Sequence, residues 1–142
     1  LRLPTKESNG RANLHPGGIG AGVDLPSGFT HHAVQRNSFV LSHPDTGLPV
    51  IGFRVPYWRE VVDMSQRVAE AAGLGYIGVD IVVDAERGPM LLEANARPGL
   101  AIQIANARGL KPRLDEIDQL KLAEAKSKCQ ATPAAQPVRR AA

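Results

Sequence analysis

Residues 78–99, GVDIVVDAERGPMLLEANARPG, constrain the fold more than any other part of this 142-residue chain. Residues 79–84 are rich in β-branched side chains, which favour strands. Residues 89–95 form a second apolar run. The four residues between the two runs are polar and end in glycine. The segment therefore predicts a β-hairpin.

The predicted hairpin brings two carboxylates face to face. If the four intervening residues form the loop, Asp84 faces Pro89. Counting back along both strands then places Asp80 opposite Glu93, with Asn95 two residues further on the same face. Facing carboxylates repel each other and destabilise a strand pair, whereas Mg²⁺ takes oxygen ligands and completes its shell with water and substrate phosphates. We therefore predict a metal–nucleotide site with Asp80, Glu93 and Asn95 as ligands.

The alternative is that the acids lie on the solvated face of an amphipathic hairpin and that Asn95 only opens a turn. Three features favour the metal site. The strands are otherwise almost entirely apolar, so the acids interrupt runs that resemble buried strands. Arg97 follows Asn95 by two residues and supplies a donor suited to phosphate. Pro98 and Gly99 then break the strand, which puts the polar cluster at a strand end.

These motifs resemble a known family. GVDIVVD followed by GPMLLEANARPGL is similar to the C-terminal core of ATP-grasp ligases, where an aspartate on one strand and Glu-x-Asn on the next hold Mg²⁺. Residues 10–18, GRANLHPGG, resemble the Arg-x-Asn-Leu-His-x-Gly-Gly loop of the ribosomal-protein glutamate ligases. The RLPT, SHPDTGLP and PGLAIQIAN segments are similar to α-L-glutamate ligase-like proteins related to those enzymes. The resemblance covers about residues 1–114.

The resemblance implies an ATP- and Mg²⁺-dependent carboxylate–amine ligase that acts through an acyl phosphate. It implies one or two Mg²⁺ (or Mn²⁺), ATP as co-substrate, glutamate as a carboxylate substrate and an amine acceptor. Arg11, Asn13 and Arg97 are then the expected phosphate-binding residues. Arg11 and Arg97 are also the expected catalytic residues, because phosphoryl transfer depends mainly on positioning and charge neutralisation. An ordinary surface loop is the alternative for residues 10–18.

Two other functions stay open. The chain is either a ligase or a metal- or nucleotide-binding remnant that needs an N-terminal half or a homo-oligomer. A metal-dependent phosphohydrolase is a third reading, although the hairpin motif holds no histidine to activate water. Leu1 resembles the middle of a strand, and similar enzymes carry their phosphate-binding lysines and adenine-pocket strand before this point. We therefore expect a truncated chain, the C-terminal portion of a longer ligase.

Composition excludes several classes of protein. An apolar content of 43% and a charged content of 22% are ordinary for a globular domain. A net charge of +3 and few aromatic residues give little support to nucleic-acid binding. The single cysteine excludes an internal disulfide and favours the cytoplasm. No apolar run is long enough to cross a membrane.

The predicted fold class is α+β, an ATP-grasp C-terminal subdomain with an antiparallel sheet and packed helices, incomplete at its N-terminus. Residues 1–126 form the expected domain, and residues 127–142 have the alanine, proline and basic composition of a disordered tail. The expected elements are a strand at 1–4, a hairpin at 19–25 and 29–35, a helix at 58–72 capped by Gly73, a short helix at 100–108 and a helix from Pro112 to about residue 128.

Overall fold

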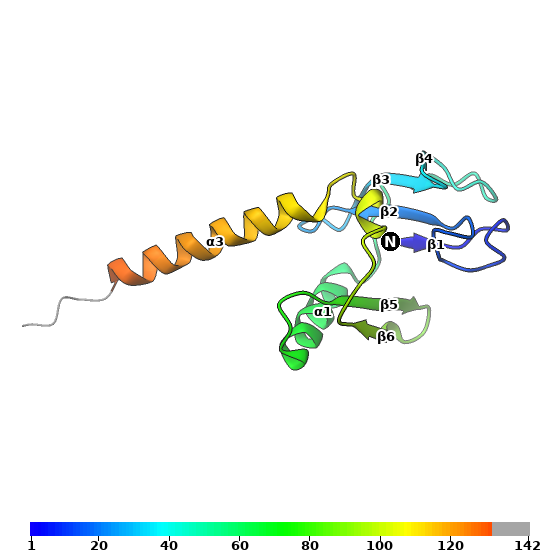
Figure 1. Cartoon of the computed structure of the whole chain (residues 1–142). Coiled ribbons are helices and arrows are strands. Elements are labelled where there is room, and N and C mark those ends of the chain that lie inside the picture. The colour runs from blue at the N-terminus through cyan, green and yellow to red at the C-terminus, as the bar shows by residue number, and fades with distance from the viewer. Residues whose placement is uncertain (132–142) are drawn as a thin grey trace, which may run out of the picture. The chain divides into compact units, whose positions relative to one another are not determined.

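The computed structural model of the chain describes residues 1–131 (Figure 1). The chain divides into two units, Leu1–Arg108 and Gly109–Ala142. The described part of the second unit is one helix, α3 (Leu110–Ala131). This helix continues past residue 127, and residues 132–142 of the expected tail lie outside the described residues.

The first unit contains a four-stranded antiparallel sheet in the order β1-β2-β3-β4. The predicted hairpin at residues 19–35 is confirmed as β2 and β3. β4 was not predicted. It follows β3 through a two-residue turn, Arg36 and Asn37, in which both residues have positive φ angles as a type I′ turn requires. The strands are β1 (Arg2–Leu3), β2 (Ile19–Val23), β3 (Thr30–Gln35) and β4 (Ser38–Phe39).

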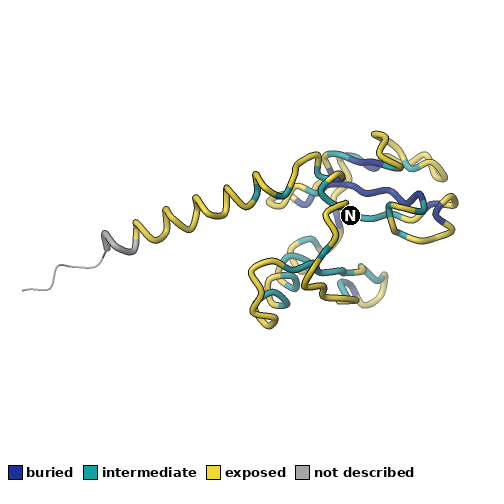
Figure 2. The backbone as a smooth tube through the Cα atoms, viewed as in Figure 1, coloured by how far each residue is buried: buried dark blue, intermediate teal, exposed yellow. Residues whose placement is uncertain are grey.

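The buried core lies on this sheet, where Figure 2 shows β2 as the most continuously buried strand. Ile19 and Ala33 are completely inaccessible to solvent, and Val50 packs with them. Leu3 of β1 and the preceding Leu1 pack against this cluster. Apolar burial is the main driving force of folding, so the stability of the unit is concentrated here.

Helix α1 (Trp58–Ala72) has the bounds that the sequence predicts. Gly73 ends it in the left-handed conformation, and its N–H donates to the carbonyls of Ala69 and Glu70. The helix packs on the two strands that follow it. None of its fifteen residues is buried, so it covers this part of the unit only loosely.

Strands β5 (Gly78–Asp84) and β6 (Gly88–Asn95) form the predicted hairpin. They make a separate two-stranded sheet, so the predicted α+β class with antiparallel strands and packed helices is confirmed and its strands divide between two sheets. The expected burial of the hairpin was wrong, because Val82 is 41% exposed and Leu92 is 67% exposed. A two-stranded sheet with a helix packed on it does not bury both of its faces.

Helix α2 (Ile102–Ala105) is shorter than the predicted helix at 100–108 and lies against β2 and β3. Glycines in β2 make this close approach possible. A Cβ atom on Gly20 would lie 3.1 Å from the Cβ of Ala105, and one on Gly22 would lie 2.6 Å from the Ala105 carbonyl oxygen. In the described part of the chain, no helix is long and apolar enough to cross a membrane.

Candidate metal and nucleotide site

The register of the hairpin brings Asp80 opposite Glu93, as predicted. The predicted loop length was wrong, because Asp84 pairs with Gly88 and the turn has three residues. A β-bulge at Leu92 adds one residue to β6 and restores the predicted pairing. Bulges re-aim side chains and increase local twist. The opposed carboxylates therefore result from a shorter turn and a compensating bulge.

The turn of the hairpin is held by a side chain of its own. Asp84 Oδ1 accepts hydrogen bonds from the N–H groups of Glu86 and Arg87, both at 2.9 Å. The bond from Arg87 and then that from Glu86 hold the pKa of the Asp84 carboxyl below its usual value. Gly88 takes the positive φ of 72° that closes the turn. This turn sets the register from which the two acids are positioned.

Asn95 ends β6 on the same face as Glu93. Its Oδ1 accepts the N–H of Arg97 at 2.9 Å, which makes a turn immediately after the strand. An amide oxygen has two lone pairs, so one remains for a further partner. Pro98 folds back over β5 at Gly78, where a Cβ atom would lie 2.7 Å from the Cβ of Pro98. The side chains of Glu93, Asn95 and Arg97 are exposed.

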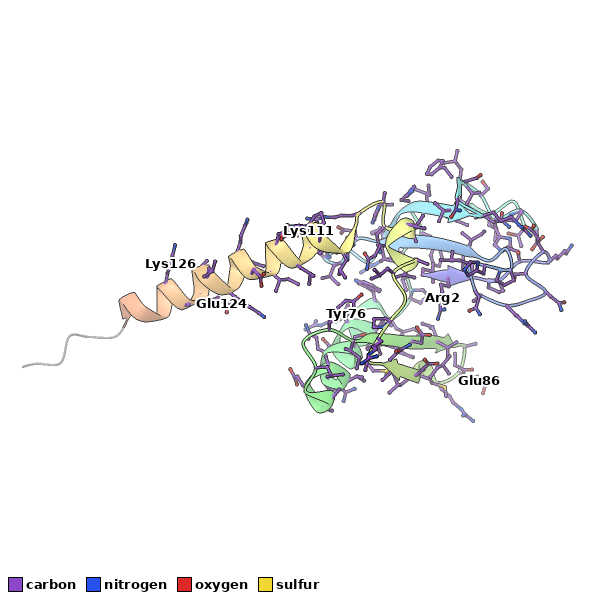
Figure 3. The ribbon with its side chains drawn as sticks, viewed as in Figure 1. Arg2, Tyr76, Glu86, Lys111, Glu124 and Lys126 are labelled. Atoms are coloured by element: carbon purple, nitrogen blue, oxygen red, sulfur yellow. The ribbon has the colours of Figure 1, made fainter. Side chains whose placement is uncertain are left out.

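Arg2 of β1 contacts the site and was missed by the sequence analysis. Its Nη2 donates to Asp80 Oδ2 at 2.8 Å, and Figure 3 labels its side chain between β1 and the β5–β6 hairpin. Leu1 and Leu3 pack on the core, so the residue between them faces the opposite way. The Leu-Arg-Leu alternation was the available signal, but the sequence does not reveal which acid the arginine meets.

Arg11 and Asn13 lie in the loop between β1 and β2, with exposed side chains. This loop is ordered by buried polar groups: Thr5 N–H donates to Ser8 Oγ and Ser8 Oγ to the Thr5 carbonyl, each at 2.9 Å. Arg11 N–H donates to the Ser8 carbonyl, and Gly18 N–H to the Asn13 carbonyl. Backbone bonds therefore determine the position of both residues and leave their side chains free to bind a ligand.

The donor set fits a hard cation. Within residues 1–131, no group of three or more His, Cys, Asp or Glu side chains is placed to hold a metal ion. The predicted ligands are two carboxylates and the Asn95 amide, all of which offer oxygen atoms. This incomplete oxygen set suits Mg²⁺, which keeps water and substrate phosphates in its shell, and does not suit a metal that requires thiolate or imidazole.

A pocket of about 390 Å³ lies beside the loop that carries Asn13. It is lined by Leu14 and His15 of this loop and by Ala101 and Ile104 of the segment after Arg97. Arg36 also lines the pocket, and its guanidinium is paired with Glu7. The fold thus brings the GRANLHPGG loop and the PGLAIQIAN segment together around one pocket.

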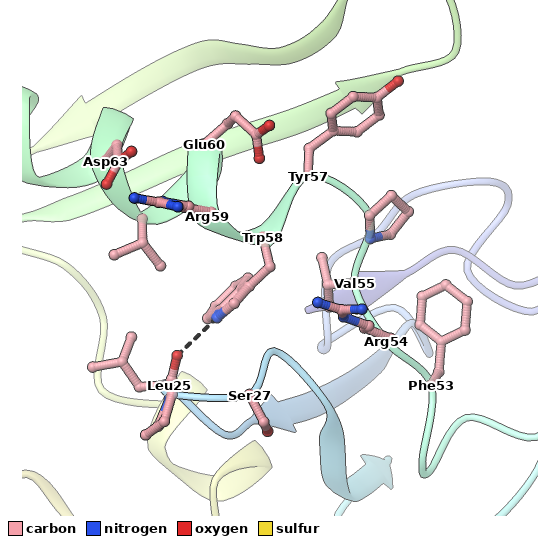
Figure 4. A pocket seen from close by; sticks show the side chains of 13 residues that line it. Leu25, Ser27, Phe53, Arg54, Val55, Tyr57, Trp58, Arg59, Glu60 and Asp63 are labelled. Carbon is pink, nitrogen blue, oxygen red and sulfur yellow. Dashed lines mark hydrogen bonds between the residues drawn. The ribbon is translucent and has the colours of Figure 1, made fainter.

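A larger pocket of about 770 Å³ lies at the start of α1 (Figure 4). Trp58 is fixed in its wall, because its Nε1 donates to the Leu25 carbonyl at 2.8 Å. The ring also packs so closely on Gly28 that a Cβ atom there would lie 2.6 Å from it. This pocket contains none of the predicted site residues.

The α+β architecture, with antiparallel sheets and packed helices, is consistent with part of an ATP-grasp domain, the class with an ATP-dependent ligase-type fold. A model of one family in this class, described as sugar-transfer associated ATP-grasp, matches residues 1–119. The chain therefore belongs to the sugar-transfer associated ATP-grasp family. Neither a curated protein nor a solved structure matches it.

Proposed function

We propose that the chain acts in an ATP- and Mg²⁺-dependent carboxylate–amine ligation, with Asp80, Glu93 and Asn95 holding the metal of a Mg–ATP complex. The observation that carries this proposal is the cross-strand pairing of Asp80 with Glu93. Directly opposed acids are unfavourable in a strand pair, and a bound cation reverses the sign of that interaction. Membership of an ATP-grasp family supports ATP as the source of the phosphates.

In the proposed site, bound Mg²⁺ would neutralise charge on the ATP phosphates. Arg97 is held beside Asn95 by its backbone N–H and would pair with the transferred phosphoryl group. Arg11 and Asn13 would contact the phosphates from the loop between β1 and β2. Arginine suits this role because its guanidinium remains charged and donates in a planar fork.

The proposed reaction has two steps. A carboxylate oxygen attacks the γ-phosphorus of ATP, the bond to the β-phosphate oxygen breaks, and ADP leaves. An amine then attacks the acyl carbon of the resulting acyl phosphate, inorganic phosphate leaves, and the amine nitrogen loses a proton. Neither step needs a protein nucleophile, and arginines of this kind contribute by stabilising charge.

The substrates are proposed from two sources. The resemblance of the GRANLHPGG loop to the ribosomal-protein glutamate ligases favours glutamate as the carboxylate. The description of the matching family refers to sugar transfer, which favours a sugar acid or an amino sugar as one reactant. The single cysteine favours a reducing compartment, and we propose the cytoplasm.

The test is ADP formation from Mg–ATP with glutamate or a sugar acid, with and without amines that include amino sugars. Hydroxylamine traps the acyl phosphate as a hydroxamate. We expect Glu93→Gln to lower turnover by about a hundredfold or more, the scale for removing a group that stabilises transition-state charge. Glu86→Gln in the same hairpin is the matched control and leaves turnover unchanged.

Near wild-type turnover by Glu93→Gln would contradict the proposal. Phosphate release without any carboxylate or amine would instead support the phosphohydrolase reading. Binding of Mg–ATP without turnover of any substrate pair would support the remnant reading.

A further inference from the structure

Asp80 already has a cation as its partner. Arg2 Nη2 lies 2.8 Å from Asp80 Oδ2, and the two side chains are 35% and 46% exposed. The ion pair offsets the repulsion between Asp80 and the opposed Glu93, because one of the two negative charges is neutralised. The hairpin therefore tolerates two facing acids before any metal binds.

The same contact opposes the binding of a free metal ion. A divalent cation that approaches Asp80 meets a guanidinium at hydrogen-bond distance from one of the two carboxylate oxygens. The two cations repel each other and compete for that oxygen. The metal must displace Arg2 or bind beside it, and either course lowers its affinity.

A metal ion that arrives with a nucleotide does not carry this penalty. The phosphates of Mg–ATP bring excess negative charge, and a displaced guanidinium can pair with a phosphate oxygen as it did with the carboxylate. A single ion pair that is only partly buried is worth little, so Arg2 can leave Asp80 readily. Arg2 would then exchange one anion for another.

We propose that Arg2 is a resident counterion that weakens the binding of free divalent metal at Asp80 and yields to a metal–nucleotide complex. This inference rests on the proposed metal–ATP site and adds to it a preference for metal bound to nucleotide over metal alone. Arg2 is thus a positioning residue for Asp80 in the empty site. Its position on β1 makes metal binding by the hairpin depend on the other sheet of the same unit.

Arg2→Gln tests the inference, because it should change two affinities in opposite directions. Titration with Mn²⁺ alone, followed by the electron paramagnetic resonance signal of free Mn²⁺, should show binding that is about two- to fivefold tighter than in the wild type, the factor expected for an ion pair that solvent still reaches. Calorimetry with the magnesium complex of a non-hydrolysable ATP analogue should show weaker binding. The increase in Mn²⁺ affinity should shrink with added salt.

Two variants serve as controls. Arg59→Gln removes the same charge from the exposed surface of α1 and should leave both affinities unchanged. Arg2→Lys keeps the charge and should bind Mn²⁺ much as the wild type does. Simple damage to the fold would weaken both affinities together, and it would lower the melting temperature.

An Mn²⁺ affinity that Arg2→Gln leaves unchanged or lowers would overturn the inference alone. A wild-type chain that binds neither Mn²⁺ nor the magnesium–nucleotide complex would overturn the proposed function, and the inference with it. Glu93→Gln shows whether the measured Mn²⁺ binds at the hairpin. If it does, this substitution should abolish Mn²⁺ binding in both the wild-type and the Arg2→Gln background.

Discussion

The four-stranded sheet and the β5–β6 hairpin are organised differently, although both are antiparallel. The sheet is built around side chains with no exposed surface, among them Ile19 and Ala33. The hairpin has no such core, and its acids lie on half-exposed or exposed strands. Its geometry depends instead on a capped turn and a bulge. The candidate site therefore depends on local hydrogen bonds for its register and on the neighbouring sheet for its stability.

The largest expected effect is a loss of stability, which should differ between the two regions because their side chains differ in burial. Ile19→Ala removes a completely buried side chain and should lower the free energy of unfolding by about 2–5 kcal/mol. Leu92→Ala is the matched control in the hairpin; its side chain is 67% exposed, so the change should stay within about 0.5 kcal/mol. Denaturation by urea measures both. Equal losses would contradict the assignment of the core to the four-stranded sheet.

The second prediction concerns the close contact between β2 and α2. Gly22→Ala places a Cβ atom 2.6 Å from the Ala105 carbonyl oxygen, and overpacking of this kind costs about 1–3 kcal/mol. Gly75→Ala adds a methyl group where nothing lies within 4 Å and should have little effect. If both variants melt at the same temperature, α2 does not pack on β2 as described.

The smallest effect concerns two turns that an aspartate caps, at Asp84 in the hairpin and at Asp24 between β2 and β3. The pKa of Asp84 is lowered by backbone hydrogen bonds, and that of Asp24 by the Ser27 hydroxyl and then by its N–H. A carboxyl whose pKa is lower in the folded state stabilises the fold above its unfolded pKa of about 3.9. That stability is lost as the pH falls through the lowered value.

Asp84→Asn and Asp24→Asn should each reduce the dependence of the melting temperature on pH in this acid range. The two reductions should be similar and additive, because both turns are exposed and locally held and each carboxyl is partnered by groups within three residues of it. A reduction confined to one turn would show that the two regions differ in their turns as well as in their burial.

Local patterns predicted several elements well. The apolar spacing and Gly73 predicted α1 with its observed bounds, because helix periodicity and a left-handed C-terminal residue are local properties. The opposition of Asp80 and Glu93 was also predicted, although by a four-residue loop where the structure has a three-residue turn and a bulge at Leu92. A bulge depends on how a strand twists against its neighbour, and the residue order does not reveal it.

Residue order alone was enough to predict the class of elements, the hairpin and the opposition of its two acids, since alternation and turn chemistry act over a few residues. It could not predict that the hairpin forms its own half-exposed sheet or that Arg2 contacts Asp80, seventy-eight positions away in the chain, because both depend on the folded unit. Such a contact depends on which faces of β1 and β5 are left after the apolar side chains have been buried. Burial depends on how the whole unit packs, whereas hairpin pairing and capping depend on residues that are close in the sequence.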